Sequence, residues 1–167
     1  MNIYILRHGL AVEPGSEGFH KDSERPLTGK GERKLRKIAK AMKKLSLSFD
    51  CILSSPYLRA RQTARIVADY LGCGKKLELT DALTPSGSLK KLIEEVNERK
   101  PKAKNVLIVG HEPYLSELVS LLISGDIEVA VTMKKAGLCS ITVEELRPGQ
   151  CARLEWLLTP KQLCLMA

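Results

Sequence analysis

Aromatic residues are scarce in this sequence. They make up 4% of the chain, so the flat surfaces on which proteins stack single-stranded nucleic acid are in short supply. We therefore expect no nucleic acid partner.

Paired cysteines and long apolar runs are lacking as well. The five cysteines are odd in number and widely spaced, without a C-x-x-C pair, which disfavours a disulfide framework and a zinc site. No apolar run approaches the ~20 residues that span a membrane, and no basic leader with an apolar segment opens the chain. These features predict no membrane association, no signal peptide and a cytoplasmic location.

The charge, by contrast, is strongly one-sided. The chain has 167 residues, a formal net charge of +8 and a sequence pI of about 9.3. Its length predicts a single domain over residues 1–167, and a positive field steers anions, including phosphorylated molecules, toward the protein. Much of the excess lies between Lys30 and Lys44, where a solvated helix face is the simpler interpretation.

Short apolar runs alternate with amphipathic helical patterns along the chain. The run Val106–Val109 is apolar throughout, as expected of a strand covered on both faces. This alternation predicts an α/β fold, with a single three-layer α/β/α domain and a mostly parallel central sheet flanked by helices. We expect strands at 2–6, 51–54, 77–79, 106–109, 127–132, 138–143 and 153–158, the later ones antiparallel, and helices from 28, from the Ser55-Pro56 cap, around 89–96 and from Pro113 to about 123.

Histidine and arginine follow three of these strands. Arg7-His8-Gly9 ends the first, Ser55 to Arg59 follows the second, and Gly110-His111 follows Val106–Val109. Because sites in open α/β sheets form at the carboxyl ends of strands, we expect two histidines and two arginines to meet at one rim.

Such a set suits phosphoryl transfer. Arginine forks and helix N-termini bind phosphate oxygens, and a neutral histidine among them can attack phosphorus in line while the cations stabilise the developing charge. No metal or other cofactor is required for this chemistry. The nucleophile needs one ring nitrogen free and the other held by a group such as a backbone carbonyl, and nearby positive charge lowers its proton affinity.

Each residue alone has a plainer interpretation. A histidine after a strand is commonly structural, Arg59 could be a surface arginine, and Gly110-His111-Glu112-Pro113 could be a simple turn. Their joint occurrence at strand ends is what favours a site.

Two motifs and a dipeptide carry a resemblance to a known family. Leu6-Arg7-His8-Gly9, the segment Ser54-Ser55-Pro56-Tyr57-Leu58-Arg59-Ala60-Arg61-Gln62-Thr63 and Gly110-His111 occur in order, and together they resemble the histidine phosphatase (phosphoglycerate mutase-like) superfamily over nearly the whole chain. The resemblance implies that His8 is the phosphorylated nucleophile and that Arg7, Arg59 and His111 form the phosphate pocket, with Gly9 as a substrate-binding residue.

Within the superfamily the chain is most similar to the small phosphohistidine phosphatases of the SixA type. The marks are its short length, Arg25-Pro26-Leu27-Thr28 and Leu83-Thr84-Pro85. This resemblance implies that Arg25 also binds phosphate. A solvated loop arginine is the plainer alternative. The short stretch from Gly72 to Asn105 predicts an open pocket that would admit a protein-borne phosphohistidine.

The proton donor is the least defined part of the predicted site. A SixA-like alignment places a carboxylate where Ala82 stands, and Asp81 lies one residue away, so Asp81 is a possible acid. An alkoxide leaving group needs a proton in the transition state more than a phosphoramidate nitrogen does. A missing acid would therefore favour P–N substrates.

The predicted function is thus dephosphorylation of a histidine-phosphorylated protein through a phosphohistidine intermediate. One alternative is a phosphomonoesterase for a small phosphorylated metabolite, with Glu112 and the Ala11–Arg25 loop lining its pocket. Another is a noncatalytic phosphoprotein or polyanion binder, which the net charge permits but which would not need a nucleophile. The sequence predicts no oligomeric state.

Overall fold

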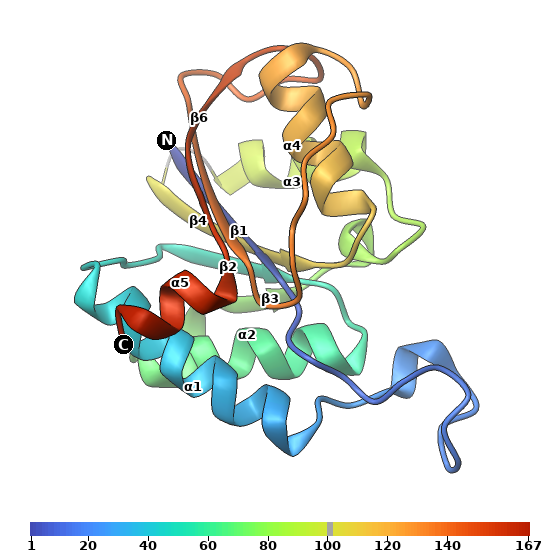
Figure 1. The fold of residues 1–167 in the computed structure, drawn as a ribbon. Coiled ribbons are helices and arrows are strands. Elements are labelled where there is room, and N and C mark those ends of the chain that lie inside the picture. Colours follow the sequence, from blue (N-terminus) through green and yellow to red (C-terminus); the bar gives the residue numbers. More distant parts are fainter. Residues whose placement is uncertain (100–101) are drawn as a thin grey trace.

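A computed structural model describes residues 1–99 and 102–167. Its centre is a six-stranded sheet with the order β3-β2-β4-β1-β5-β6 (Figure 1). The strands are β1 (Asn2–Arg7), β2 (Cys51–Ser54), β3 (Leu77–Leu79), β4 (Asn105–Gly110), β5 (Leu138–Val143) and β6 (Ala152–Leu158). The helices are α1 (Gly29–Lys44), α2 (Leu58–Tyr70), α3 (Leu89–Arg99), α4 (Tyr114–Ser124) and α5 (Pro160–Leu165), with short 3-10 turns η1 (Asp22–Glu24), η2 (Gly74–Lys76) and η3 (Asp81–Leu83).

The sheet is parallel on one side and antiparallel on the other. Strands β1, β4, β2 and β3 pair in parallel, whereas β5 runs antiparallel to both β1 and β6. The centre of β4 is buried from Val106 through Gly110, because helices cover both faces of the sheet. The predicted α/β class and the antiparallel direction of the late strands are confirmed.

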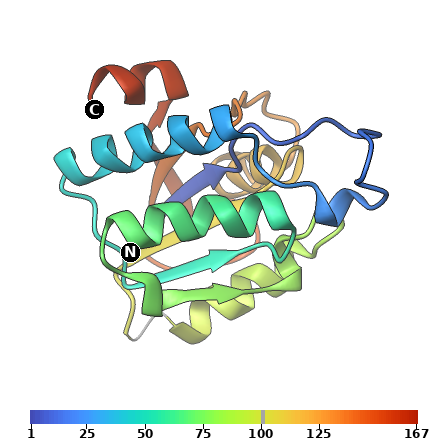
Figure 2. The ribbon, with the colours of Figure 1, turned by 90° about the horizontal axis from the view of Figure 1, so that it is seen from below.

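Each face of the sheet carries its own apolar cluster. Helices α1, α2 and α5 cover one face and α3 and α4 the other, as Figures 1 and 2 show. Helix α1 packs on the sheet through an apolar stripe in which Leu35, Ile38 and Met42 are fully buried. Thr28 caps α1 by accepting a hydrogen bond from the Gly31 amide. The basic residues of α1 are left on its outer side.

Two local predictions were wrong. Residues 127–132 form no strand, because this segment is held instead by the Ser120 hydroxyl, which bonds the Asp126 carbonyl and the Val129 amide, and Ile127 is 56% exposed. Helix α2 begins at Leu58 with Tyr57 at the cap position, rather than with Ser55 as its cap.

The C-terminal helix α5 packs on the core through Leu163. Thr159 and Gln162 form a reciprocal capping box at the start of α5, and the Leu163 side chain is fully buried among the residues of the α1–α2 face. Among the described residues, no helix is both long and apolar enough to cross a membrane.

Candidate functional site

The parallel register of β1 and β4 places the two histidines side by side. Arg7 pairs with Gly110 across the strands, and the His8 amide donates to the Gly110 carbonyl at 3.0 Å. The residues that follow, His8 and His111, therefore leave the sheet together, with ring centroids 5.1 Å apart. Both side chains are buried.

The His8 ring is held in one tautomer. Its Nδ1 lies 2.8 Å from the Gly9 carbonyl oxygen, which can only accept, so Nδ1 carries the proton. Its Nε2 lies 3.3 Å from Nε of Arg59, which can only donate. Nε2 therefore presents a lone pair toward the cationic side of the site, as a nucleophile must.

Burial lowers the pKa of His8 to about 3. The hydrogen bond to Gly9 opposes this shift, and the positive charges of Arg59, Arg7 and Lys135 add to it. The ring is therefore neutral over the physiological pH range, and its lone pair is not consumed by a proton.

His111 is oriented by the second strand-end segment. Its Nε2 lies 2.8 Å from Oγ of Ser55, and the edge of the Tyr57 ring lies against it with centroids 5.2 Å apart. Burial lowers the pKa of His111 to about 3, with the charge of Arg59 adding to the shift. Its buried Nδ1 has no hydrogen-bond partner within the part of the chain that the structure describes. Such groups are retained chiefly where function uses them.

Gly9 supports the nucleophile from behind. Its carbonyl holds His8, its amide donates to Oγ1 of Thr63 at 3.0 Å, and a Cβ at this position would lie 2.6 Å from Cδ1 of Leu35. Gly9 does not line the cavity in front of His8. Its place in the Arg-His-Gly motif is thus explained by close packing behind the ring.

Asp22 was missed by the sequence analysis, although it lies three residues before Arg25. Its carboxylate bridges two arginines: Oδ2 accepts from Nη2 of Arg59 at 2.8 Å, and Oδ1 accepts from Nε of Arg25 at 2.8 Å. Nη1 of Arg59 also donates to the Asp22 carbonyl at 2.7 Å. Burial raises the pKa of this carboxyl, but the hydrogen bonds and charges of the two arginines outweigh burial and lower it overall.

These side chains surround a cavity of about 290 Å³. It brings together five of the predicted site residues and adds carboxylates, a lysine and two prolines; the lining is Arg7, His8, Ala11, Glu13, Pro14, Asp22, Arg25, Arg59, Pro85, His111, Glu112 and Lys135. Arg25 thus lies in the cavity wall rather than in a solvated loop. A dianion fits such a wall, because three guanidinium groups and two histidines meet there.

The structure does not bring Asp81 to this cavity. Asp81 is exposed in η3, where its carbonyl accepts from the Thr84 hydroxyl, and only Pro85 from this stretch reaches the lining. A one-residue offset turns the side chain away, while Ala82 points into the core and is 1% exposed.

Three carboxylates do line the cavity, and their surroundings differ. Asp22 is held ionised by two arginines, and Glu13 is 71% exposed and faces Lys135 at 3.6 Å. Glu112 is half-buried, and Oε1 accepts from the Ser116 amide at 3.1 Å. Burial raises the pKa of Glu112, against the lowering effects of that hydrogen bond and of Arg7. Burial thus favours the protonated form of Glu112, whereas the two arginines favour the ionised form of Asp22.

Comparisons with known proteins point to one family. The family model for the histidine phosphatase superfamily (branch 1) matches residues 3–84. The phosphohistidine phosphatase SixA homolog of Haemophilus influenzae is 35% identical over 130 residues, covering 73% of this chain and 77% of that protein. Phosphohistidine phosphatase SixA of Escherichia coli is 29% identical, with 98% and 96% of the two chains covered. A solved structure of the protein histidine phosphatase SixA complexed with tungstate has a TM-score of 0.84 at 29% identity and covers 98% of this chain and 99% of that one.

Proposed function

Because the chain belongs to the histidine phosphatase superfamily (branch 1), we propose that it removes phosphoryl groups from histidine-phosphorylated proteins, with His8 as the transient phosphoryl acceptor. One observation supports this above the others. The His8 ring is neutral, its Nδ1 is held by the Gly9 carbonyl, and its Nε2 lone pair faces a cavity lined by arginines.

The first step moves the phosphoryl group onto His8. Nε2 attacks phosphorus, the P–N bond to the substrate imidazole breaks, and its electron pair leaves with that nitrogen, which takes up a proton. The phosphorylated His8 ring becomes positively charged, and the Nδ1–H bond to the Gly9 carbonyl stabilises that charge. In the second step a water oxygen attacks phosphorus, the P–Nε2 bond breaks with its electron pair returning to Nε2, and orthophosphate is released.

The phosphoryl oxygens replace the Asp22 carboxylate on the arginines. In the free protein, the Asp22 carboxylate accepts hydrogen bonds from the guanidinium groups of Arg25 and Arg59. A dianion presents more charge than a carboxylate to the same donors, and like-charge repulsion then moves Asp22 away. His111 and Arg7 take the remaining equatorial oxygens in this arrangement.

Glu112 is the proton donor in this proposal. It lines the cavity beside Arg7 and holds its proton more readily than a solvated glutamic acid because it is half-buried. Its proton goes to the leaving nitrogen in the first step, and it regains a proton from the attacking water in the second. This assignment replaces Asp81, which lies outside the cavity.

The shape of the site favours a protein substrate. Between α2 and β4, helix α3 packs on the sheet through Leu92, Ile93 and Val96, so it does not cover the rim. Within the described residues of that stretch, Pro85 alone lines the cavity. A phosphohistidine on the surface of another protein could therefore reach His8.

A phosphomonoesterase for a small metabolite is the second candidate. It is favoured by Glu112, because a poised carboxylic acid would also assist an alkoxide leaving group. The two candidates share the nucleophile and differ in substrate, so one pair of assays separates them.

The test is phosphate release from a histidine-phosphorylated protein by the wild type and by His8→Ala. We expect release with the wild type, none with the variant, and an acid-labile phosphoryl label on wild-type protein quenched during turnover. His8-dependent release from a small ester alone would shift the proposal to the metabolite enzyme. If the wild type releases phosphate from no phosphoryl donor, the noncatalytic phosphoprotein or polyanion binder is the remaining candidate.

A further inference from the structure

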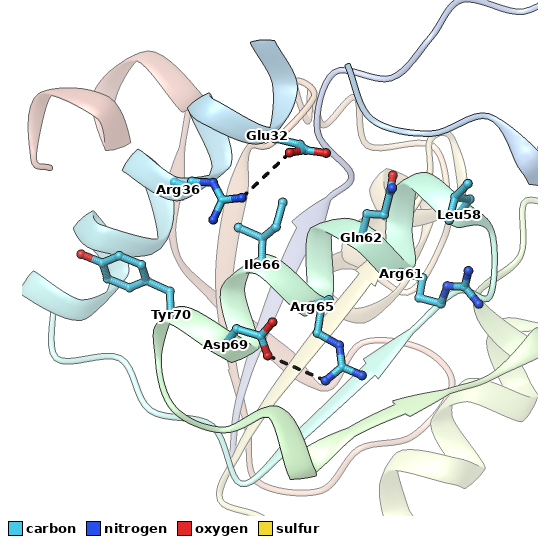
Figure 3. Close-up of a pocket in the computed structure, with 9 residues that line it drawn as sticks. All are labelled: Glu32, Arg36, Leu58, Arg61, Gln62, Arg65, Ile66, Asp69 and Tyr70. Atoms are coloured by element: carbon cyan, nitrogen blue, oxygen red, sulfur yellow. Dashed lines mark ion pairs between the residues drawn. The ribbon is translucent and has the colours of Figure 1, made fainter. Parts of the chain in front are cut away.

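A second and larger hollow lies between α1 and α2, outside the catalytic cavity. It encloses about 810 Å³, and Figure 3 shows the side chains of the two helices around it. Its lining combines charged, polar and apolar groups: Glu32, Arg36, Leu58, Arg61, Gln62, Arg65, Ile66, Asp69 and Tyr70. The proposed chemistry uses none of these side chains.

The hollow begins next to the catalytic residues. Its α2 side is one stripe of residues three or four positions apart from Leu58 to Asp69, beside the row that holds the buried Arg59 and Thr63. Leu58 directly precedes Arg59, which lines the catalytic cavity. The stripe spans roughly 16 Å of helix at 1.5 Å per residue. A segment lying along it would therefore end at the mouth of the catalytic site.

The charges on its walls are available to a partner. Nη2 of Arg36 lies 3.9 Å from Oε2 of Glu32, and Nη1 of Arg65 lies 3.7 Å from Oδ1 of Asp69 (Figure 3). All four side chains are at least 41% exposed. Exposed pairs at these separations contribute little to stability and exchange partners easily. Arg61 is exposed and forms no ion pair with any described residue.

The net positive charge of the chain is concentrated on the two helices that border this hollow. Helix α1 carries eight lysines and arginines against one glutamate, and the exposed side of α2 adds Arg61 and Arg65 against Asp69. In the rest of the sequence, acidic and basic residues are equal in number. The counted residues of α1 and of the exposed side of α2 thus account for the whole excess of +8, and a negatively charged partner would be steered toward these two helices.

We propose that this hollow, the α1–α2 groove, docks an acidic segment of the phosphorylated protein substrate and positions its phosphohistidine at His8. The inference rests on the proposed function. A protein segment suits the groove better than nucleic acid does, because Leu58, Ile66 and Tyr70 offer apolar contact that a charged phosphate backbone cannot use.

The experiment compares two substrates. Arg61→Glu combined with Arg65→Glu should raise KM for a histidine-phosphorylated protein by about tenfold or more while kcat stays close to wild type, because charges at the rim of an interface act mainly on encounter. The kinetics with phosphoramidate, which is too small to reach the groove, should be unchanged. Arg61→Ala alone breaks no ion pair and should give a smaller rise in the same KM.

Lys90→Glu combined with Lys91→Glu is the matched control. Both residues are exposed on α3, on the other face of the sheet, so the same change in net charge should leave KM for the protein substrate unaltered. Added salt should raise that KM for the wild type and much less for the groove variant.

The outcomes separate the two proposals. A wild type that hydrolyses phosphoramidate but no protein phosphohistidine would refute the proposed function itself. If the wild type acts on the protein and the groove variant shows the same KM, docking is refuted while the function stands. An equal rise in KM for the α3 control would mean a general charge effect. Loss of nucleic acid binding in the groove variant, with KM unaffected, would assign the groove to nucleic acid instead.

Discussion

Nε of Arg59 lies 3.3 Å from Nε2 of His8, so the nucleophilic lone pair is covered by a donor from another element. Arg59 comes from the first turn of α2, and its guanidinium also holds Asp22. The groups of the free site are therefore paired with one another. The Arg59 guanidinium contacts the nucleophilic nitrogen of His8, and the Asp22 carboxylate accepts hydrogen bonds from Arg59 and Arg25. Substrate must exchange these contacts for its own, which links phosphate binding to exposure of the nucleophile.

Removal of the Asp22 carboxylate should strengthen the binding of phosphate. In Asp22→Ala the forks of Arg25 and Arg59 no longer have an internal acceptor. We expect the inhibition constant of orthophosphate to fall by about tenfold, equivalent to roughly 1.4 kcal/mol. Glu24→Ala, in the same 3-10 turn but paired with Lys21 at the surface, should leave it unchanged. A higher inhibition constant of orthophosphate for Asp22→Ala would mean that Asp22 orders the arginines rather than competing with phosphate.

Loss of the Glu112 acid should depend on the leaving group. Glu112→Gln keeps the shape of the side chain and removes its acidic proton, so turnover of an alkyl phosphate should fall by roughly 100-fold. Turnover of p-nitrophenyl phosphate, whose leaving group needs little protonation, should fall only slightly. The decline of alkyl phosphate turnover as pH rises through the pKa of Glu112, which burial raises, should vanish in the variant.

Asp81→Asn is the control for that experiment, because Asp81 lies outside the cavity. It should leave the rates on both esters at the wild-type level. A strong loss with Asp81→Asn and none with Glu112→Gln would return the proton-donor role to Asp81.

The two buried histidines should make stability depend on pH. Burial lowers the pKa values of His8 and His111 to about 3, from an ordinary value of 6.5. Between these values the unfolded chain binds more protons than the folded one, so the free energy of unfolding is highest above about pH 6.5 and falls as pH drops toward 3. Urea unfolding midpoints measured over this range should show the fall. His8→Asn should flatten it, and His20→Asn, at an exposed position, should not.

The first turn of α1 contains a matched pair of glycines. A Cβ on Gly31 would lie 2.1 Å from the Leu10 carbonyl oxygen, whereas a Cβ on Gly29 would meet only the end of the Arg33 side chain at 3.5 Å. Gly31→Ala should lower the free energy of unfolding by about 1–3 kcal/mol, because backbone must move to accept it. Gly29→Ala should be neutral or slightly stabilising. Equal unfolding midpoints for the two variants would contradict the close approach of α1 to residue 10.

Local pattern was enough to predict most of the fold. Runs such as Cys51–Ser54 and Val106–Val109 bury their side chains only when both faces of the sheet are covered. The apolar stripe of α1 likewise must pack against another element to be buried. The segment 127–132 has apolar residues at alternate positions, as a strand would, but it folds irregularly because the Ser120 hydroxyl bonds the neighbouring Asp126 carbonyl and the Val129 amide. No pattern within that segment shows this competition.

The sequence by itself determined that His8, Arg59 and His111 would meet, because each follows a strand and parallel strands end at one edge of the sheet. Only the tertiary structure decided what surrounds them. Asp22 reaches Arg59 across 37 residues of chain, Glu112 enters the cavity while Asp81 does not, and α1 and α2 leave a charged groove between them. Strand ends are specified by local periodicity, whereas these contacts depend on the path of a loop and the spacing of two helices, which follow only from packing of the whole chain.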